Sequence, residues 1–147
     1  MEKHECRTYF SLNFDFDIKK NAGLLKKRRD CEPEEIGILN KKEAEGAVIK
    51  AFGIIPEWKR HRFVLGFNEN YNVDVNEMLR VTLKDLFGKE EQIKKLKKEF
   101  SLSAILEIVP VIASNSNEPN QYLSLERDII EFLYKSETDI DLDYYVV

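Results

Sequence analysis

The feature that most constrains the fold is a strict alternation of apolar and polar residues close to the N-terminus. Within residues 8–18 every second residue is large and apolar: Phe10, Leu12, Phe14, Phe16 and Ile18. Successive side chains of a β-strand point to opposite faces of its sheet, so this period of two predicts a strand with one buried and one open face. Such strands belong to antiparallel or mixed sheets that are covered on one side only.

Three further segments alternate in the same way. Residues 62–73 predict a second strand and residues 102–113 a third. The core-facing residues of the second strand are expected to include Phe63, Leu65 and Phe67. Pro110 lacks the N–H that a β-ladder uses, so we expect an edge position or a bulge there. Apolar residues alternate with aspartates over residues 139–146, which predicts a C-terminal strand.

Four helices are predicted between these strands, because apolar residues recur there every three or four positions. The first helix is expected to begin at the cap Asn40 and to end at Gly53, and the second to begin at Asp74 or Asn76 and to end at Gly88. The third is expected over residues 90–100, and the last begins at the cap Ser124. Residues 19–39 are irregular and strongly charged, with a short strand as one option at residues 36–39.

Length and composition bound the architecture. A chain of 147 residues allows one domain, and 43% hydrophobic residues are enough to build a core. We therefore expect a single α+β domain over residues 1–147, with residues 19–39 as a charged insert. The order of elements predicts a four- to five-stranded, mostly antiparallel sheet with helices packed on one face.

The sequence carries no motif of a common catalytic class: no G-x-S-x-G, no H-E-x-x-H, no P-loop and no G-x-G-x-x-G. His4, which we expect in a flexible terminus, and Cys6, Cys31 and His61 lack the paired spacing of a structural zinc site. We therefore expect no enzyme, no catalytic residue, no metal and no cofactor.

No apolar run has the length of a secretory signal core or of a membrane helix. Cys6 and Cys31 do not form a C-x-x-C pair, and reduced thiols are the plain interpretation. We expect a cytoplasmic protein that does not contact a membrane.

The net charge of −4 averages two unlike parts of the chain. Residues 1–62 carry 14 basic and 11 acidic side chains, whereas residues 63–147 carry 9 and 16. Charge of one sign on one surface favours partners of the opposite sign, so each part suggests its own candidate site.

The acidic candidate site combines Asp15 and Asp17, on the outer face of the first strand, with Asp139, Asp141 and Asp143 on the last. If these strands were neighbours, like charges would lie opposite one another and destabilise the sheet. Three interpretations stay open: a staggered register with solvated carboxylates, a surface for a basic partner, or a site for a divalent cation.

The basic candidate site combines a charged cluster in the insert with the segment around the single tryptophan. Its residues are Lys26, Lys27, Arg28, Arg29, Trp58, Lys59, Arg60 and Arg62. Such residues can grip phosphates while the Trp58 ring stacks on a base. The competing interpretation is that Trp58 fills the core. No recognised nucleic-acid module is visible in the sequence.

Three pieces of the chain together resemble the bacterial domain-of-unknown-function family 4279. They are the strand Tyr9–Asp17, the helix end Phe52-Gly53-Ile54-Ile55-Pro56-Glu57-Trp58, and the tail that runs from Leu123 through a helix to Asp139–Tyr144. The resemblance implies a small cytoplasmic α+β domain without an established activity. The sequence departs from the family pattern after Trp58, where Lys59-Arg60-His61 replaces a Lys-x-Gly turn.

The resemblance also implies a class of function. Some members of the family lie beside toxin genes, where small acidic domains often act as immunity proteins. Our leading hypothesis is therefore a non-enzymatic protein-binding module whose partner is a protein, with toxin immunity as its specific form. The alternative is a nucleic-acid-binding protein, and a third hypothesis is a small-molecule pocket near Phe52 and Phe63. The oligomeric state stays open.

Overall fold

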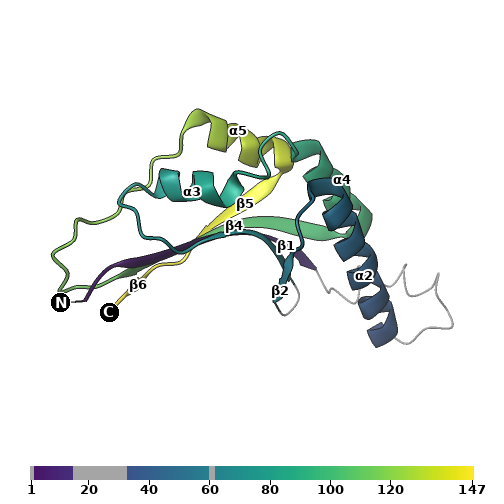
Figure 1. Cartoon of the computed structure of the whole chain (residues 1–147), viewed down its shortest axis with the longest axis horizontal. Coiled ribbons are helices and arrows are strands. Elements are labelled where there is room, and N and C mark those ends of the chain that lie inside the picture. Colours follow the sequence, from purple (N-terminus) through teal and green to yellow (C-terminus); the bar gives the residue numbers. More distant parts are fainter. Residues whose placement is uncertain (1, 15–32, 60–61) are drawn as a thin grey trace.

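The protein consists of one β-sheet covered on one face by helices (Figure 1). The computed structural model describes residues 2–14, 33–59 and 62–147, with the side chains of residues 33–40 left aside. Most of the charged segment predicted at residues 19–39 lies outside the described residues. Among the helices that are described, none is both long and apolar enough to cross a lipid bilayer.

The sheet has the strand order β2-β3-β1-β4-β5, and β6 also pairs with β4. The strands are β1 (Glu5–Phe14), β2 (Glu57–Lys59), β3 (Arg62–Asn68), β4 (Leu102–Ile112), β5 (Thr138–Leu142) and β6 (Tyr145–Val146). β1 is antiparallel to β3 and β4, and β2 is antiparallel to β3, whereas β5 and β6 run parallel to β4. The predicted α+β class and mostly antiparallel sheet are therefore confirmed.

The alternation that opened the sequence analysis forms the middle of this sheet. Phe10, Leu12 and Phe14 of β1 are buried beneath the helices, as the period of two predicted. The strand begins earlier than predicted, at Glu5, and all ten of its residues pair with β4. β1 is thus an inner strand that contacts a neighbour on both sides.

A bulge changes the faces of β3. Ser11 pairs with Val64 and Phe10 pairs with Gly66, so Leu65 is an extra residue between them. An extra residue shifts the alternation by one position. As a result Phe67 lies on the open face, 44% exposed, and the prediction that it faces the core was wrong.

The four described helices are α2 (Pro33–Phe52), α3 (Val75–Leu83), α4 (Glu90–Phe100) and α5 (Arg127–Ser136). The predicted cap Asp74 accepts a hydrogen bond from the backbone N–H of Asn76. Ser124 was wrongly predicted as a cap, because α5 begins after Glu126. The Phe132 ring of α5 packs against Phe10 of the sheet, with 6.1 Å between the ring centroids.

Helix α2 begins at Pro33, seven residues before the predicted cap Asn40. The interpretation of residues 33–39 as irregular chain with a short strand was therefore wrong. Proline suits the first turn of a helix, because the backbone N–H that it lacks would have no partner within the helix there. The helix ends where predicted, at Gly53, which has a φ of 67°.

His4 is fixed in place, so the prediction of a flexible terminus at this residue was wrong. Its side chain is only 6% exposed. The ring Nδ1 accepts a hydrogen bond from the backbone N–H of Ala113 at 3.0 Å, and Nε2 lies 3.2 Å from the carbonyl oxygen of Glu118. Because Nδ1 accepts, Nε2 carries the proton and donates to Glu118.

Pro110 lies in an inner strand, and the sheet accommodates it by dividing the last strand in two. The Ile108 carbonyl accepts a hydrogen bond from the Asp143 N–H, and the Ile112 carbonyl accepts one from the Val147 N–H. The backbone N–H and C=O groups of the even-numbered residues of β4 therefore face β5 and β6. The missing N–H of Pro110 therefore points to the gap between these two strands. The prediction of an edge position or a bulge was therefore wrong, because β4 pairs with strands on both sides without a shift in register.

Gly66 provides a test of how closely the sheet and α3 approach. A Cβ atom at this position would lie 2.0 Å from the backbone carbonyl oxygen of Thr82 in α3. We expect Gly66→Ala to lower the free energy of unfolding by about 2–3 kcal/mol, because helix and strand must move apart.

The matched control is Gly46→Ala in α2, where an added Cβ meets no atom within 4 Å. This change should raise the free energy of unfolding by up to about 1 kcal/mol, since alanine favours a helix interior. Urea denaturation of both variants measures the difference. Equal stability of the two would contradict the close approach.

Candidate functional site

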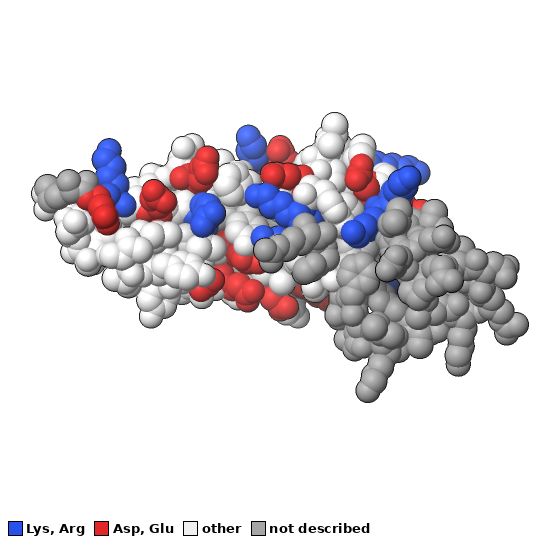
Figure 2. Space-filling view, turned by 90° about the horizontal axis from the view of Figure 1, so that it is seen from below, with Lys and Arg blue, Asp and Glu red and all other residues white. Residues whose placement is uncertain are grey.

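The candidate site lies on the face of the sheet that the helices leave open, and on the sheet edge beside it. Seen from below, acidic side chains gather along one stretch of this face with basic side chains next to them (Figure 2). The basic residues Arg7 and Arg62 belong to β1 and β3, whereas Glu107 and the aspartates belong to β4 and the C-terminal segment. The acidic side chains of β4 and the C-terminal segment therefore lie beside the basic ones of β1 and β3, and Glu5 of β1 and Glu57 of β2 share this face.

Strand β5 and the residue that follows it carry an exposed row of carboxylates, Asp139, Asp141 and Asp143, which we call the acidic row. Asp139 pairs with Ile105 and Asp141 with Glu107, so both side chains share the open face with Glu107. Asp143 follows β5, and its Oδ2 accepts a hydrogen bond from the Tyr145 hydroxyl at 2.9 Å. This hydrogen bond, together with the carboxylate charge, raises the pKa of Tyr145.

The aspartates of the first and last strands would lie opposite one another only if these strands were neighbours. β4 lies between β1 and β5, so the first and last strands are not neighbours. Asp15 and Asp17 lie outside the described residues. The like-charge contact in the sheet is instead between Glu107 and Asp141, which are register partners in the parallel pair of β4 and β5.

A polar cluster across three strands offsets the charge of Glu107. The Tyr9 hydroxyl donates a hydrogen bond to Glu107 Oε2, and Arg62 contacts both, at 3.1 Å to the Tyr9 oxygen and 3.2 Å to Glu107 Oε1. The guanidinium carbon of Arg62 also lies 4.9 Å from the centre of the Tyr9 ring. Burial, and then the Glu107 carboxylate, raise the pKa of Tyr9. The sequence analysis singled out Arg62 but missed Tyr9 and Glu107.

β5 is an edge strand, because no strand in the described part of the chain pairs with its outer side. The Asp143 N–H donates to Ile108 of β4, and backbone groups alternate in direction along a strand. The N–H and C=O groups of Ile140 and Leu142 therefore point away from the sheet. Their side chains lie on the helix-covered face, 40% and 57% exposed.

An apolar groove of about 300 Å³ lies beside this edge, on the helix-covered side of the sheet. Its walls include Ile108, Pro110 and Ile112 of β4 and Leu142 and Tyr144 of the C-terminal segment. The facing wall is the loop that contains Tyr122 and Leu123.

Hydrogen bonds to α3 and to the segment before it hold this loop in position. The Tyr122 N–H donates to the Val73 carbonyl at 2.9 Å, and the Val75 N–H donates to the Tyr122 carbonyl at 3.1 Å. The buried Asn76 side chain donates to Glu126 at 2.6 Å. The groove therefore has a fixed wall on each side.

Trp58 packs into the structure. Its ring centroid lies 4.3 Å from that of Phe63 and 5.7 Å from that of Phe14, and the Lys41 ammonium lies 4.5 Å from its centre. These contacts favour the core interpretation of Trp58 over a free stacking platform. Lys59 forms an ion pair with Glu57 at 3.6 Å. Of the other predicted phosphate-binding residues, Lys26, Lys27, Arg28, Arg29 and Arg60 lie outside the described residues.

The remaining candidates from the sequence occupy ordinary structural positions where they are described. Phe63 is fully buried and Phe52 nearly so, which makes both rings part of the core. Cys6 is buried, and burial raises the pKa of its thiol. Cys31 and His61 lie outside the described residues. Within the described residues, no three His, Cys, Asp or Glu side chains cluster closely enough to hold a metal ion.

The polar cluster predicts a measurable change in the ionisation of Tyr9. Replacing Glu107 with Gln removes a negative charge that opposes formation of the phenolate, so the pKa of Tyr9 should fall. In Glu107→Gln burial still raises the pKa of Tyr9, whereas the retained Arg62 guanidinium lowers it. Titration of the Tyr9 ring carbon by NMR measures this.

Tyr145 serves as the internal control in the same spectra, because its raised pKa comes from Asp143. A fall in the pKa of Tyr145 equal to that of Tyr9 would mean that Glu107 acts on the whole face and not through the cluster.

Comparison with known proteins gives one family match. Neither the curated proteins nor the solved structures contain a significant match to this chain. A family model described as a domain of unknown function, DUF4279, matches residues 40–147. The match includes the helix end at Gly53 and the tail from Leu123, whereas the strand Tyr9–Asp17 precedes it. Because the matched residues make up well over half of the chain, the protein belongs to the DUF4279 family.

Proposed function

We propose that this protein is a non-enzymatic protein-binding module that uses the acidic row to recognise a basic surface of its partner. The observation that carries the proposal is the exposure of Asp139 and Asp141 on the edge strand β5 and of Asp143 just after it. Three carboxylates at alternate positions form a line of negative charge on one face, and such a line attracts a partner of opposite charge.

The contrast with other carboxylates of the chain supports this proposal. Arg80 neutralises Asp128 at 2.6 Å and Glu126 at 2.7 Å, and it lowers the pKa of Asp128. Arg62 similarly contacts Glu107. Within the described residues, no Lys or Arg forms an ion pair with Asp139 or Asp141. The negative charge of the row therefore stays available to a partner.

A role without catalysis agrees with the chemistry of the described residues. Cys6 is a buried thiol whose pKa is raised, and a nucleophile requires the opposite shift. His4 uses both ring nitrogens in structural hydrogen bonds. Neither group has the exposure and activation that covalent catalysis requires.

Toxin immunity is the specific form of this function that the family resemblance suggests. An immunity protein that covers a basic active site would act by steric and electrostatic occlusion. Complementary charge mainly accelerates association, which suits an inhibitor that must reach its toxin quickly. Co-expression with a toxin encoded beside this gene tests this form, since an immunity protein restores growth.

The acidic row itself can be tested by charge removal. Asp139→Asn, Asp141→Asn and Asp143→Asn combined should slow association with the partner about tenfold at low salt and flatten the salt dependence of the rate. The partner is first isolated by cross-linking in the source cells and purified, and stopped-flow mixing then gives the rates.

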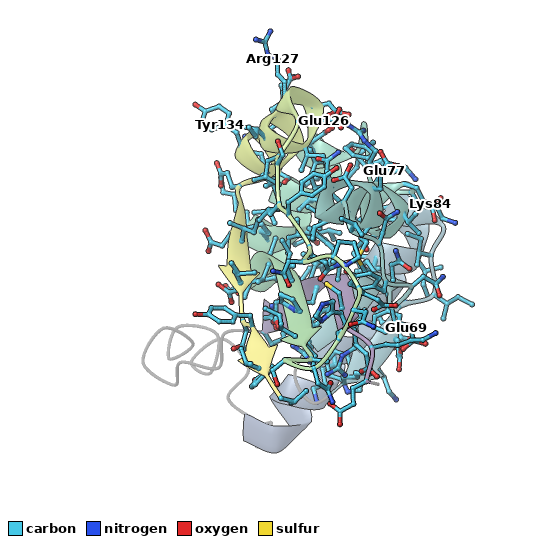
Figure 3. The ribbon with its side chains drawn as sticks, turned by 90° about the vertical axis from the view of Figure 1, so that its left-hand side faces the viewer. Glu69, Glu77, Lys84, Glu126, Arg127 and Tyr134 are labelled. Atoms are coloured by element: carbon cyan, nitrogen blue, oxygen red, sulfur yellow. The ribbon has the colours of Figure 1, made fainter. Side chains whose placement is uncertain are left out.

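The matched control removes the same formal charge elsewhere, with Glu69→Gln, Glu77→Gln and Asp85→Asn. Glu69 and Glu77 lie on the opposite side of the molecule from the yellow strands β5 and β6 (Figure 3). The control should keep most of the wild-type rate. If the acidic-row variant associates as fast as the control, the row is not the binding surface.

The alternative, nucleic-acid binding, has its own direct test. A gel-shift titration with single-stranded DNA at about 50 mM and about 300 mM salt would detect a basic interface, because such binding weakens steeply as salt rises. We expect no shift at either concentration. Binding at low salt that Arg62→Ala weakens would favour the alternative.

A further inference from the structure

We infer that the β5 edge is the docking site for an extended segment of the partner in which basic and apolar residues alternate. The inference rests on the proposed function and deepens it, because it names the conformation and chemistry of the bound segment. Three features of the edge carry it: free backbone groups, the acidic row on one face, and the apolar groove on the other.

The backbone of β5 offers the hydrogen bonds. Ile140 and Leu142 direct their N–H and C=O groups away from β4, as the bond from Asp143 to Ile108 requires. An added strand pairs with such groups and extends the sheet. The opposite edge of the sheet is less suitable, because β2 is only three residues long.

The two faces of the edge determine which side chains the added strand carries. Asp139 and Asp141 lie on the open face, whereas Ile140 and Leu142 lie on the other face, where Leu142 also lines the apolar groove. A bound strand alternates its side chains between the same two faces. Its residues beside the aspartates are therefore Lys or Arg, and those beside Ile140 and the groove are apolar.

The same pattern disfavours a second copy of this chain as the occupant. Two β5 edges that paired with one another would place aspartates of one copy next to aspartates of the other. Like charges on facing strands destabilise a sheet, and charged residues on edge strands commonly prevent self-association. The acidic row thus blocks self-pairing while it accepts a basic strand.

The test uses a defined peptide, Lys-Val-Lys-Leu-Lys-Val-Lys, and its counterpart with Glu in place of Lys. Fluorescence anisotropy measures binding of each to the full chain. We expect the lysine peptide to bind in the micromolar to millimolar range, and the glutamate peptide to bind at least about tenfold more weakly.

Backbone methylation then separates strand addition from simple charge attraction. One lysine peptide carries N-methyl groups on the Lys residues and another carries them on the apolar residues. Only one edge of a bound strand faces β5, so one of these peptides should lose about tenfold in affinity and the other should keep most of it.

A protein variant provides a second measurement. Ile140→Pro removes an N–H that points away from β4, and Ile140→Ala keeps this N–H but shortens the side chain. The proline variant should lose peptide binding at least about fivefold more than the alanine variant. Circular dichroism verifies that both variants fold, and the methylated peptides decide the question if Ile140→Pro does not.

These experiments test strand addition at β5 separately from the proposed function of the acidic row. Absence of binding by the lysine peptide, or equal binding of the two methylated peptides, overturns strand addition at β5. In either case the proposed function still stands or falls with the acidic-row variant and the purified partner. Sedimentation that shows a dimer, which Ile140→Pro dissociates, would overturn the inference in favour of a second copy.

Discussion

The pairing of β1 with β4 is the contact on which the rest of the structure depends. All ten residues of β1 have a register partner in β4, from Glu5 with Val111 to Phe14 with Leu102. Since the side chains of a strand alternate, this one register decides which residues of both strands lie under the helices and which lie on the open face. It buries Phe10 and Leu106 together and brings Tyr9 beside Glu107.

The open face shows how a sheet can keep charges of one sign close together. Tyr9 and Arg62 hold Glu107 in hydrogen bonds, so that the carboxylate nearest the middle of the sheet is neutralised. The carboxylates of the acidic row lie further out, where water screens them, and among the contacts described the Asp143 carboxylate accepts a hydrogen bond from the Tyr145 hydroxyl. The negative charge that no basic side chain of the described residues neutralises therefore increases from the middle of the sheet to the β5 edge. Beside Pro110 the pairing partner of β4 on this side is divided into two short strands, β5 and β6.

The sequence alone predicted the fold class and most strands, because burial on one face leaves a period-two pattern that no other structure produces. It predicted the outward direction of Asp139 and Asp141 for the same reason. It did not predict strand neighbours, so whether the first and last strands lie side by side stayed open, and β4 separates them. The start of α2 was missed because a short apolar run around Ile38 suits a strand as well as a helix. Phe67 was assigned to the wrong face because the residue types around a bulge do not reveal it. The fixed position of His4 depends on partners more than one hundred residues away.

Because β1 lies in the middle of the sheet, the segment that matches the family model differs from the segment that is needed for the complete fold. The family match begins at residue 40, after β1 has ended, so the matched segment lacks the strand between β3 and β4. A fragment cut at that boundary would leave the facing edges of β3 and β4 unpaired and would expose the core residues that Phe10, Leu12 and Phe14 cover, and circular dichroism would show it as largely unstructured. Conversely, residues 2–14 contain the whole strand that the fragment lacks. The chain is in this sense a natural pair of complementing pieces, in which a short N-terminal segment completes a larger one.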